Sequence, residues 1–152
     1  MGLKAVIQRC LNASVIVNNK TVGKIEKGFV VFFGVSKDDT DPDLDYLVKK
    51  ISGLRIFEDE NSKMNRSIKD VGGEMLVIPN FTLQANTSHG FRPDFFHAMM
   101  PQRAENYFIK FIENCKATGC FKKINSGVFG ADMKVSVEND GPVTIIIDTE
   151  NK

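Results

Sequence analysis

The sequence predicts an α+β fold with a mainly antiparallel sheet or partial barrel and two principal helices. Three observations predict it. Short segments rich in Val and Ile fill the first third of the chain, two stretches carry apolar residues at helical spacing, and these two stretches lie far apart. A doubly wound parallel sheet needs a helix between successive strands, so two helices are too few for that fold.

The first third of the chain is predicted to form strands. We expect them at residues 5–9, 14–17 and 21–25, with Asn18-Asn19 as the turn before the last of these. Residues 29–33 have the sequence FVVFF, a continuous apolar run of strand length. Such a run is typical of a central strand that is covered on both faces.

Two amphipathic helices and three later strands complete the prediction. The first helix begins after Thr40, a good N-cap residue with Asp43 three positions on, and its apolar residues recur as far as Leu54. The second helix follows Pro101 and is expected to stop at Gly119. Strands are predicted at residues 74–83, 133–137 and 143–147, the last two as a closing hairpin.

Length and charge limit the possible functions. The chain has 152 residues, so residues 1–152 are expected to form a single domain with its own core. Twenty basic and nineteen acidic residues give a formal net charge of +1. Any contact with nucleic acid must therefore come from a local patch rather than from bulk charge.

The composition favours a cytoplasmic protein. Its three cysteines are an odd number without CxxC spacing, which is typical of reduced thiols. The first residues lack the apolar core and cleavage site of a signal peptide. No apolar run approaches the roughly 20 residues that span a bilayer, so no membrane partner is expected.

Common catalytic motifs are absent from the sequence. There is no GxGxxG, GxxxxGK[ST], HExxH or GxSxG motif. The two histidines, His89 and His97, lack a third ligand at suitable spacing, so neither a metal nor a cofactor is expected. Cys115 falls on the apolar face of the second helix, where a buried hydrophobe is the simpler interpretation than a nucleophile.

Asn80 and Thr82 stand out in the otherwise apolar segment 76–83, LVIPNFTL. Strand alternation would put both on one face, roughly 6.5 to 7 Å apart. Taken alone, the pair is explained more simply by a strand face open to solvent. Pro79 cannot donate to a ladder, however, so the strand should end or bulge here, where a ligand can meet backbone N–H groups.

A second candidate is the segment Asn139-Asp140-Gly141-Pro142. Asp-Gly is a strong turn signal, so the segment predicts a hairpin turn. Gly141-Pro142 at its tip would present two carbonyl groups and no bulky side chain, which makes a rigid main-chain surface. The sequence does not fix the isomer of this peptide bond, because most X-Pro bonds in folded proteins are trans.

Seven short segments, in order, resemble the D-aminoacyl-tRNA deacylases, also called D-tyrosyl-tRNA deacylases, over nearly the whole chain. They are AVIQR at 5–9, LRIFED at 54–59, DVGGE at 70–74, FTL at 81–83, GFRP at 90–93, GADM at 130–133 and NDGPVT at 139–144. One position pair departs from the family, which usually has Ser-Gln where this chain has Pro79-Asn80. A sister branch that acts on L-alanyl esters has Pro-Gln there, but Phe81 and Pro142 match the D-specific branch.

The resemblance implies a deacylase-like fold and a homodimer that proofreads translation. Such an enzyme hydrolyses the ester joining a D-amino acid, or glycine mischarged on tRNA-Ala, to the terminal adenosine of tRNA. In the family the Gly-Pro pair is cis and enters the neighbour's pocket, so Gly141-Pro142 would be a chiral filter from the partner subunit. The remaining site residues implied are Pro79, Asn80, Phe81 and Thr82 in the pocket, with Phe129 and Met133 beside the adenosine.

Thr82 is the obvious hydroxyl nucleophile, but the sequence assigns no base to it. We therefore favour a mechanism in which backbone N–H groups around Phe81 and Thr82 stabilise the oxyanion. The 2′-hydroxyl of the tRNA would orient or activate water, and Thr82 would position the reactants. A main-chain wall beside the substrate α-carbon would exclude an L side chain and admit glycine.

Two other functions remain open from the sequence. One is a non-catalytic dimeric nucleic-acid-binding protein of the same fold, and the other is a cysteine-dependent hydrolase. Candidate contacts with the tRNA are scattered basic residues, most of which are explained more simply as solvated surface charge: Lys4, Arg9, Lys49, Lys50, Lys63, Arg66, Lys69, Arg92, Arg103, Lys122 and Lys123.

Overall fold

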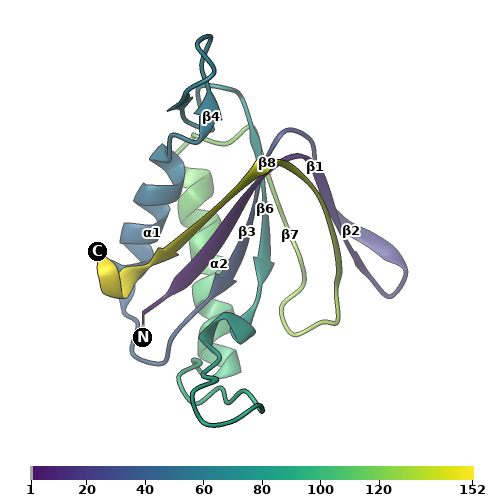
Figure 1. Ribbon diagram of the computed structural model, residues 1–152. Helices are drawn as coiled ribbons and strands as arrows, with labels where there is room; N and C mark the ends of the chain where they lie inside the picture. The colour runs from purple at the N-terminus through teal and green to yellow at the C-terminus, as the bar shows by residue number, and fades with distance from the viewer. Residues whose placement is uncertain (1) are drawn as a thin grey trace.

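A computed structural model describes residues 2–152 of the chain (Figure 1). Its strands are β1 (Lys4–Val17), β2 (Lys20–Ile25), β3 (Gly28–Gly34), β4 (Phe57–Glu58), β5 (Met64–Arg66), β6 (Glu74–Pro79), β7 (Lys123–Ser126) and β8 (Lys134–Asp148). Its helices are α1 (Asp41–Gly53) and α2 (Pro101–Ala117), with the short 3₁₀ helices η1 (Phe81–Gln84) and η2 (Thr149–Asn151). The predicted α+β class is confirmed.

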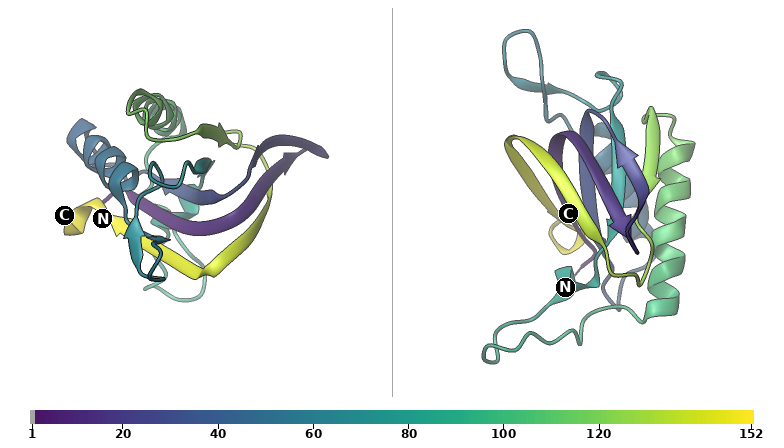
Figure 2. Two further views of the ribbon diagram at one scale, coloured as in Figure 1. Left: turned by 90° about the horizontal axis from the view of Figure 1, so that it is seen from above. Right: turned by 90° about the vertical axis from the view of Figure 1, so that its right-hand side faces the viewer.

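The main sheet has the strand order β2-β1-β3-β6-β7, and β8 pairs with β1. The long strand β1 organises it, because β1 pairs antiparallel with β2, β3 and β8, whereas β3–β6 and β6–β7 are parallel pairs. The sheet curves strongly, so that it approaches a barrel (Figure 2). This confirms the predicted partial barrel, which is mainly antiparallel with a parallel portion.

Both predicted helices form and lie side by side over the same face of the sheet (Figure 2). Asp43 fixes the start of α1, since its carboxylate accepts the Thr40 backbone N–H at 2.9 Å. Pro101 opens α2, where its missing N–H costs no helical hydrogen bond. The helix ends at Ala117, and Gly119 follows with a φ of +70°, the left-handed conformation that glycine adopts readily.

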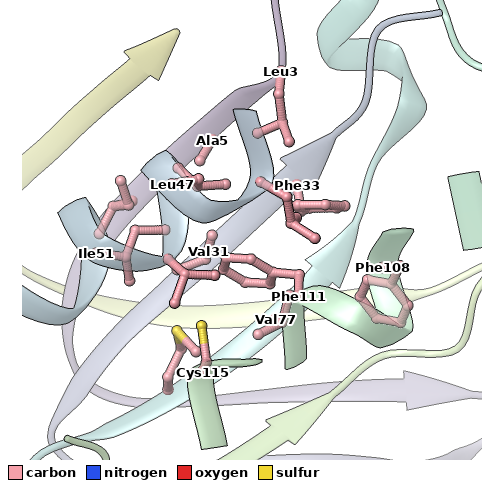
Figure 3. Packing of buried hydrophobic residues seen from close by; sticks show 14 of the residues in the cluster. Leu3, Ala5, Val31, Phe33, Leu47, Ile51, Val77, Phe108, Phe111 and Cys115 are labelled. Atoms are coloured by element: carbon pink, nitrogen blue, oxygen red, sulfur yellow. The ribbon is translucent and has the colours of Figure 1, made fainter. Parts of the chain in front are cut away.

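Alternating residues of the central strands build apolar layers on both faces of the sheet. On the helical face, Val31 and Phe33 pack under Phe111 of α2, with ring centroids of Phe33 and Phe111 4.9 Å apart (Figure 3). On the opposite face a second cluster forms around Val30, Leu76 and Ile78. This confirms that β3 is covered on both faces. Residues of β6, which pairs with β3, belong to the same two clusters, so the end of β6 is held in place from both sides.

Three strand predictions need correction. Residues 5–9 and 14–17 belong to one 14-residue strand, β1. Residues 133–137 and 143–147 form no hairpin, because residues 134–148 are the continuous strand β8, which follows β1 along its length. The Asp140-Gly141 pair does not form the predicted turn. It lies in β8 where the β1–β8 register shifts, opposite the stretch of β1 between Gln8 and Asn12. The strand predicted at 74–83 ends at Pro79.

One strand of the main sheet lies outside the sequence prediction. The short strand β7 adds to the sheet beside β6, although its sequence, KINS, carries no clear strand signal. Within residues 2–152, no helix is long and apolar enough to cross a membrane.

Candidate active site

The candidate site begins where β6 ends. Pro79 is the last residue of β6, and the next backbone N–H, that of Asn80, donates to the Phe33 carbonyl at 2.7 Å. The chain then turns into η1 directly beside β3. Gly34 permits this close approach, because a Cβ there would lie 2.6 Å from the Asn80 carbonyl oxygen. Gln84 anchors the far end of η1 through its amide Nε2, which donates to Gly34 O at 2.9 Å.

Asn80 caps η1 and holds Thr82. Its Oδ1 accepts the Thr82 backbone N–H at 3.2 Å and also accepts the Thr82 hydroxyl. The two residues are therefore in direct contact through a helix cap, and the predicted strand alternation at this position is wrong. An amide oxygen is not a base at neutral pH, so this hydrogen bond orients the Thr82 hydroxyl without activating it as a nucleophile.

The cap also distinguishes the two backbone N–H groups considered for the oxyanion. The Thr82 N–H already has Asn80 Oδ1 as its acceptor. The N–H of Phe81, the first residue of η1, has no acceptor within the helix. The geometry therefore leaves Phe81 as the better placed donor to a ligand.

Two hollows flank the Pro79-Asn80-Phe81 segment. The larger, of about 460 Å³, lies on the helical side of the sheet, and its lining includes Phe33, Val35, Phe95, Met99, Ala104 and Phe129. The smaller, of about 290 Å³, lies on the other side, and its lining includes Phe32, Ile78, Ala131, Met133 and Val135. A ligand at this edge can thus place two different groups on opposite sides of one short backbone segment.

The structure separates two residues that were expected to act together. Phe129 lines the larger hollow and Met133 lines the smaller one. Phe81 contributes to both hollows and meets Phe95 in an edge-to-face contact, with centroids 5.0 Å apart. The larger hollow is therefore the more aromatic one, since Phe33, Phe81, Phe95 and Phe129 line it and only Phe32 and Phe81 line the smaller, and this suits a planar base.

Gly141-Pro142 is exposed and is not at this edge within the same chain. The peptide bond is cis, and the dipeptide lies in β8 next to Arg9 of β1. Arg9 pairs with Phe29 at one end of β3, whereas Pro79 pairs with Phe33 four residues further along. Four residues of strand rise and three strand spacings place Gly141-Pro142 on the order of 15–20 Å from Pro79.

Arg9 holds Asp140, the residue before Gly141-Pro142, in place. The sequence did not indicate this structural role. Arg9 is only 5% exposed, and its guanidinium donates to the Asp140 carbonyl at 3.0 Å and the Ile56 carbonyl at 2.7 Å. The carboxylates of Asp140 and Glu58 lie 3.5 and 3.6 Å away. Its expected place among surface residues that contact tRNA is therefore wrong. The available signal was a charged residue that strand alternation places on the same face as Ala5 and Ile7.

The cysteines and histidines do not assemble a hydrolytic centre. Burial raises the pKa of Cys115 to about 12 and that of Cys10 to about 11, so both thiols stay protonated at neutral pH. His89 is exposed in the loop after η1, and His97 packs against Phe96 near the base of that loop. The described residues 2–152 contain no cluster of three or more His, Cys, Asp or Glu suited to a metal ion.

Known proteins match this chain over nearly its whole length. The family model described as D-Tyr-tRNA(Tyr) deacylase matches residues 6–148. The D-aminoacyl-tRNA deacylase of Clostridium novyi (strain NT) is 47% identical over 150 residues, covering 99% of each chain. That of Flavobacterium psychrophilum is 48% identical over 150 residues, with the same coverage.

Solved structures agree with these sequence matches. The c-Myc DNA Unwinding Element Binding Protein is 40% identical, with a TM-score of 0.89 over 95% of this chain and 97% of that one. A probable eukaryotic D-amino acid tRNA deacylase has a TM-score of 0.85 over 97% of this chain and 100% of its own, and at 18% identity it supports the fold alone. The full-length family match and the relatives near 47% identity establish that this chain belongs to the D-Tyr-tRNA(Tyr) deacylase family of enzymes.

Proposed function

We propose that this enzyme hydrolyses the ester bond of D-aminoacyl-tRNA and releases free tRNA and the D-amino acid. The observation that carries the proposal is the Pro79-Asn80-Phe81 segment between two hollows. An aminoacyl-adenosine has two parts of different character joined by one ester. The aromatic hollow suits the adenine, and the smaller hollow suits the aminoacyl group. The ester then lies across the backbone at Phe81.

Hydrolysis at this position depends on the backbone and on the substrate. Water attacks the ester carbonyl, and the Phe81 N–H donates to the oxyanion that develops. The bond to the 3′-oxygen then breaks, and that oxygen gains the proton released by the water. Thr82, held by Asn80, positions the reactants, and the neighbouring 2′-hydroxyl of the tRNA orients the water. The buried thiols take no part.

Chiral selection is assigned to Gly141-Pro142 of a partner subunit. The dipeptide is exposed and far from the site of its own chain, so it can act only at a second copy. Main chain beside the substrate α-carbon leaves room for hydrogen but not for an L side chain. Glycine carries two hydrogens on its α-carbon and is therefore admitted. Glycine mischarged on tRNA-Ala is thus a second substrate.

A homodimer follows from this assignment. The edge strand β8 alternates exposed and half-buried residues along its length, and Ile146 on it is 69% exposed. Among the described residues, β8 pairs with β1 and with no other strand, so its outer edge has unpaired backbone groups that a second chain can cover. Because charged tRNA is consumed in translation, we assign the activity to the cytoplasm.

The direct test is hydrolysis by the purified protein of D-tyrosyl-tRNA, L-tyrosyl-tRNA and glycyl-tRNA of tRNA-Ala. We expect release from the first and the last and retention of the L-ester. In Gly141→Ala, the added Cβ would lie 2.6 Å from the Val143 nitrogen, so the wall must shift and L-tyrosyl-tRNA should become a substrate. Hydrolysis of both tyrosyl esters at equal rates by the unmodified enzyme would refute stereoselection.

A second candidate is a non-catalytic dimeric nucleic-acid-binding protein of this fold. It is favoured by one observation, the 40% identity to a structure named as a DNA unwinding element binding protein. The same experiment distinguishes the two. Retention of every ester together with measurable binding of tRNA or single-stranded DNA would support this second function and exclude the first.

A further inference from the structure

We propose that the 86–100 loop, which connects η1 to α2, binds the unpaired nucleotides that precede the terminal adenosine of tRNA. A base stacks on Phe91, and Arg92 and Lys37 contact the phosphates. The inference rests on the proposed function, because it extends the same site outward along the substrate.

The loop is built to project from the body of the molecule. Asn86 and Asp94 close it through two backbone hydrogen bonds, of 2.8 Å from Asn86 N and 3.0 Å from Asp94 N. Inside this closure, Asn86 Oδ1 accepts the Ser88 hydroxyl at 2.7 Å. Figure 2 shows the loop reaching outward, away from the sheet and both helices. The loop therefore has a fixed shape and is not part of the core. We call its exposed surface, made by Phe91, Arg92 and Phe96 together with the adjacent Lys37, the platform.

Aromatic rings on this platform face solvent. Phe91 is 107% exposed and Phe96 is 71% exposed. Two rings left in water on one loop contribute no core packing, and exposed apolar groups that lie together mark an interaction site. Exposed aromatic rings with cations nearby are the usual means of binding single-stranded nucleic acid, because each base presents a π-face.

The charges around the rings fit a polyanion. Lys37 Nζ lies 3.4 Å from the centroid of the Phe96 ring, and Arg92 is exposed beside Phe91. The acid of the loop, Asp94, is turned to its own backbone, where its carboxylate accepts the Phe96 N–H at 3.3 Å. The outward charge of the platform is thus positive, as contact with phosphates requires.

The platform continues directly from the larger hollow. Phe95, Met99 and Met100 belong to the loop and also line that hollow, and Phe95 touches Phe81. A strand whose last base occupies the hollow must leave it past these residues. The nucleotides just before that base are therefore the ones that reach Phe91 and Arg92.

Two non-hydrolysable probes test the proposal. One is the D-tyrosyl amide of 3′-amino-adenosine, and the other is the same group at the end of a CCA trinucleotide. We expect Phe91→Ala to weaken binding of the trinucleotide roughly 5- to 20-fold, as loss of an exposed base stack does, and to leave binding of the nucleoside unchanged. Phe91→Tyr keeps a ring and should bind both probes normally.

Further variants test the charge of the loop and the effect of substitutions made away from it. Arg92→Ala should lower trinucleotide affinity and reduce the slope of log Kd against log salt concentration by about one. Ile109→Ala and Lys116→Ala change an exposed apolar residue and an exposed cation on α2, and neither should affect either probe.

Three results would overturn the proposal. One is equal affinity of the unmodified enzyme for the two probes, and another is equal weakening of both by Phe91→Ala. The third is a shift of Phe91→Ala to a smaller sedimenting species, which would make the ring a contact between copies of the chain. If the unmodified enzyme binds neither probe, the proposed function is refuted as well. If it binds the nucleoside probe and the trinucleotide probe with equal affinity, only this proposal is refuted.

Discussion

At the scale of single residues, Asn80 joins the end of a buried strand to the hydroxyl of Thr82. Its backbone N–H donates to Phe33 in β3, and its side-chain oxygen accepts both the N–H and the hydroxyl of Thr82. The position of Thr82 is thus set by the sheet. A hydroxyl held in this way can accept a hydrogen bond from water or substrate, which is the part proposed for it.

Thr82→Ala should lower kcat for D-tyrosyl-tRNA by about 10² to 10³, the usual cost of one transition-state contact. Thr82→Ser should recover most of this, because the hydroxyl can still donate to Asn80. Single-turnover hydrolysis with measured tRNA affinity checks both. A loss far above 10³ with unchanged tRNA binding would instead make Thr82 the nucleophile.

Asp39 is a buried carboxylate with a pH-dependent effect on stability. It is 3% exposed, and burial raises its pKa to about 6, although it accepts the backbone N–H groups of Ser36 and Leu3. In the unfolded chain the pKa returns to about 3.9. Between these values the native state binds a proton that the unfolded state has lost. Stability from this group is therefore present at low pH and is lost as pH rises through about 6.

We expect Asp39 to make the protein about 1 kcal/mol more stable at pH 5 than at pH 7. Asp39→Asn should abolish this difference, at some cost in stability at both values because an amide has one acceptor oxygen. Urea unfolding at the two pH values measures the effect. The neighbouring exposed Asp38→Asn is the control, and a wild-type pH dependence in Asp39→Asn would contradict the assignment.

At the scale of elements, the approach of η1 to β3 controls the site. A Cβ at Gly34 would meet the Asn80 carbonyl oxygen at 2.6 Å and the Leu83 Cβ at 2.9 Å. Because one of these atoms is backbone, the turn must move away from the strand. The displacement would carry Phe81 and Thr82 with it.

Gly34→Ala should therefore lower kcat at least tenfold and destabilise the fold by about 1–3 kcal/mol, the usual cost of overpacking. Gly53→Ala, at the end of α1, has nothing within 4 Å of the new Cβ and should leave activity unchanged. Steady-state hydrolysis and thermal unfolding of both variants check this. Wild-type kcat in Gly34→Ala would show that η1 does not position the site.

At the scale of the whole molecule, the proposed site needs a second copy of the chain. Ile146→Lys places a charge on the exposed side of β8 and should convert dimers to monomers. Selection against the L-ester should be lost with the dimer, because monomers have no Gly141-Pro142 beside the Phe81 edge. Sedimentation velocity and hydrolysis over a protein dilution series measure the two together.

Val22→Lys, on the distant strand β2, is the matched control for Ile146→Lys. It introduces the same charge at another exposed apolar position and should leave both mass and activity unchanged. A monomeric Ile146→Lys enzyme with full stereoselective activity would show that the site is complete within one chain.

The elements with a strong local signal were predictable. Helix α1 follows from Thr40, Asp43 and the apolar spacing, and β3 follows from its unbroken apolar run, because both signals act between near neighbours. The continuity of β8 was not predictable. Asp140-Gly141 is a turn signal locally, but pairing with the long strand β1 outweighs it.

The sequence by itself determined the α+β class and both helices, since each depends on short-range patterns of size, polarity and capping. It named Asn80 and Thr82 as site residues only through the family resemblance. Only the tertiary structure decided that Asn80 caps Thr82, that hollows lie on both sides of Phe81, and that Arg9 holds Asp140. It also decided that Gly141-Pro142 lies far from the site of its own chain. These facts depend on strand register and sheet curvature, which arise from contacts between residues distant in sequence.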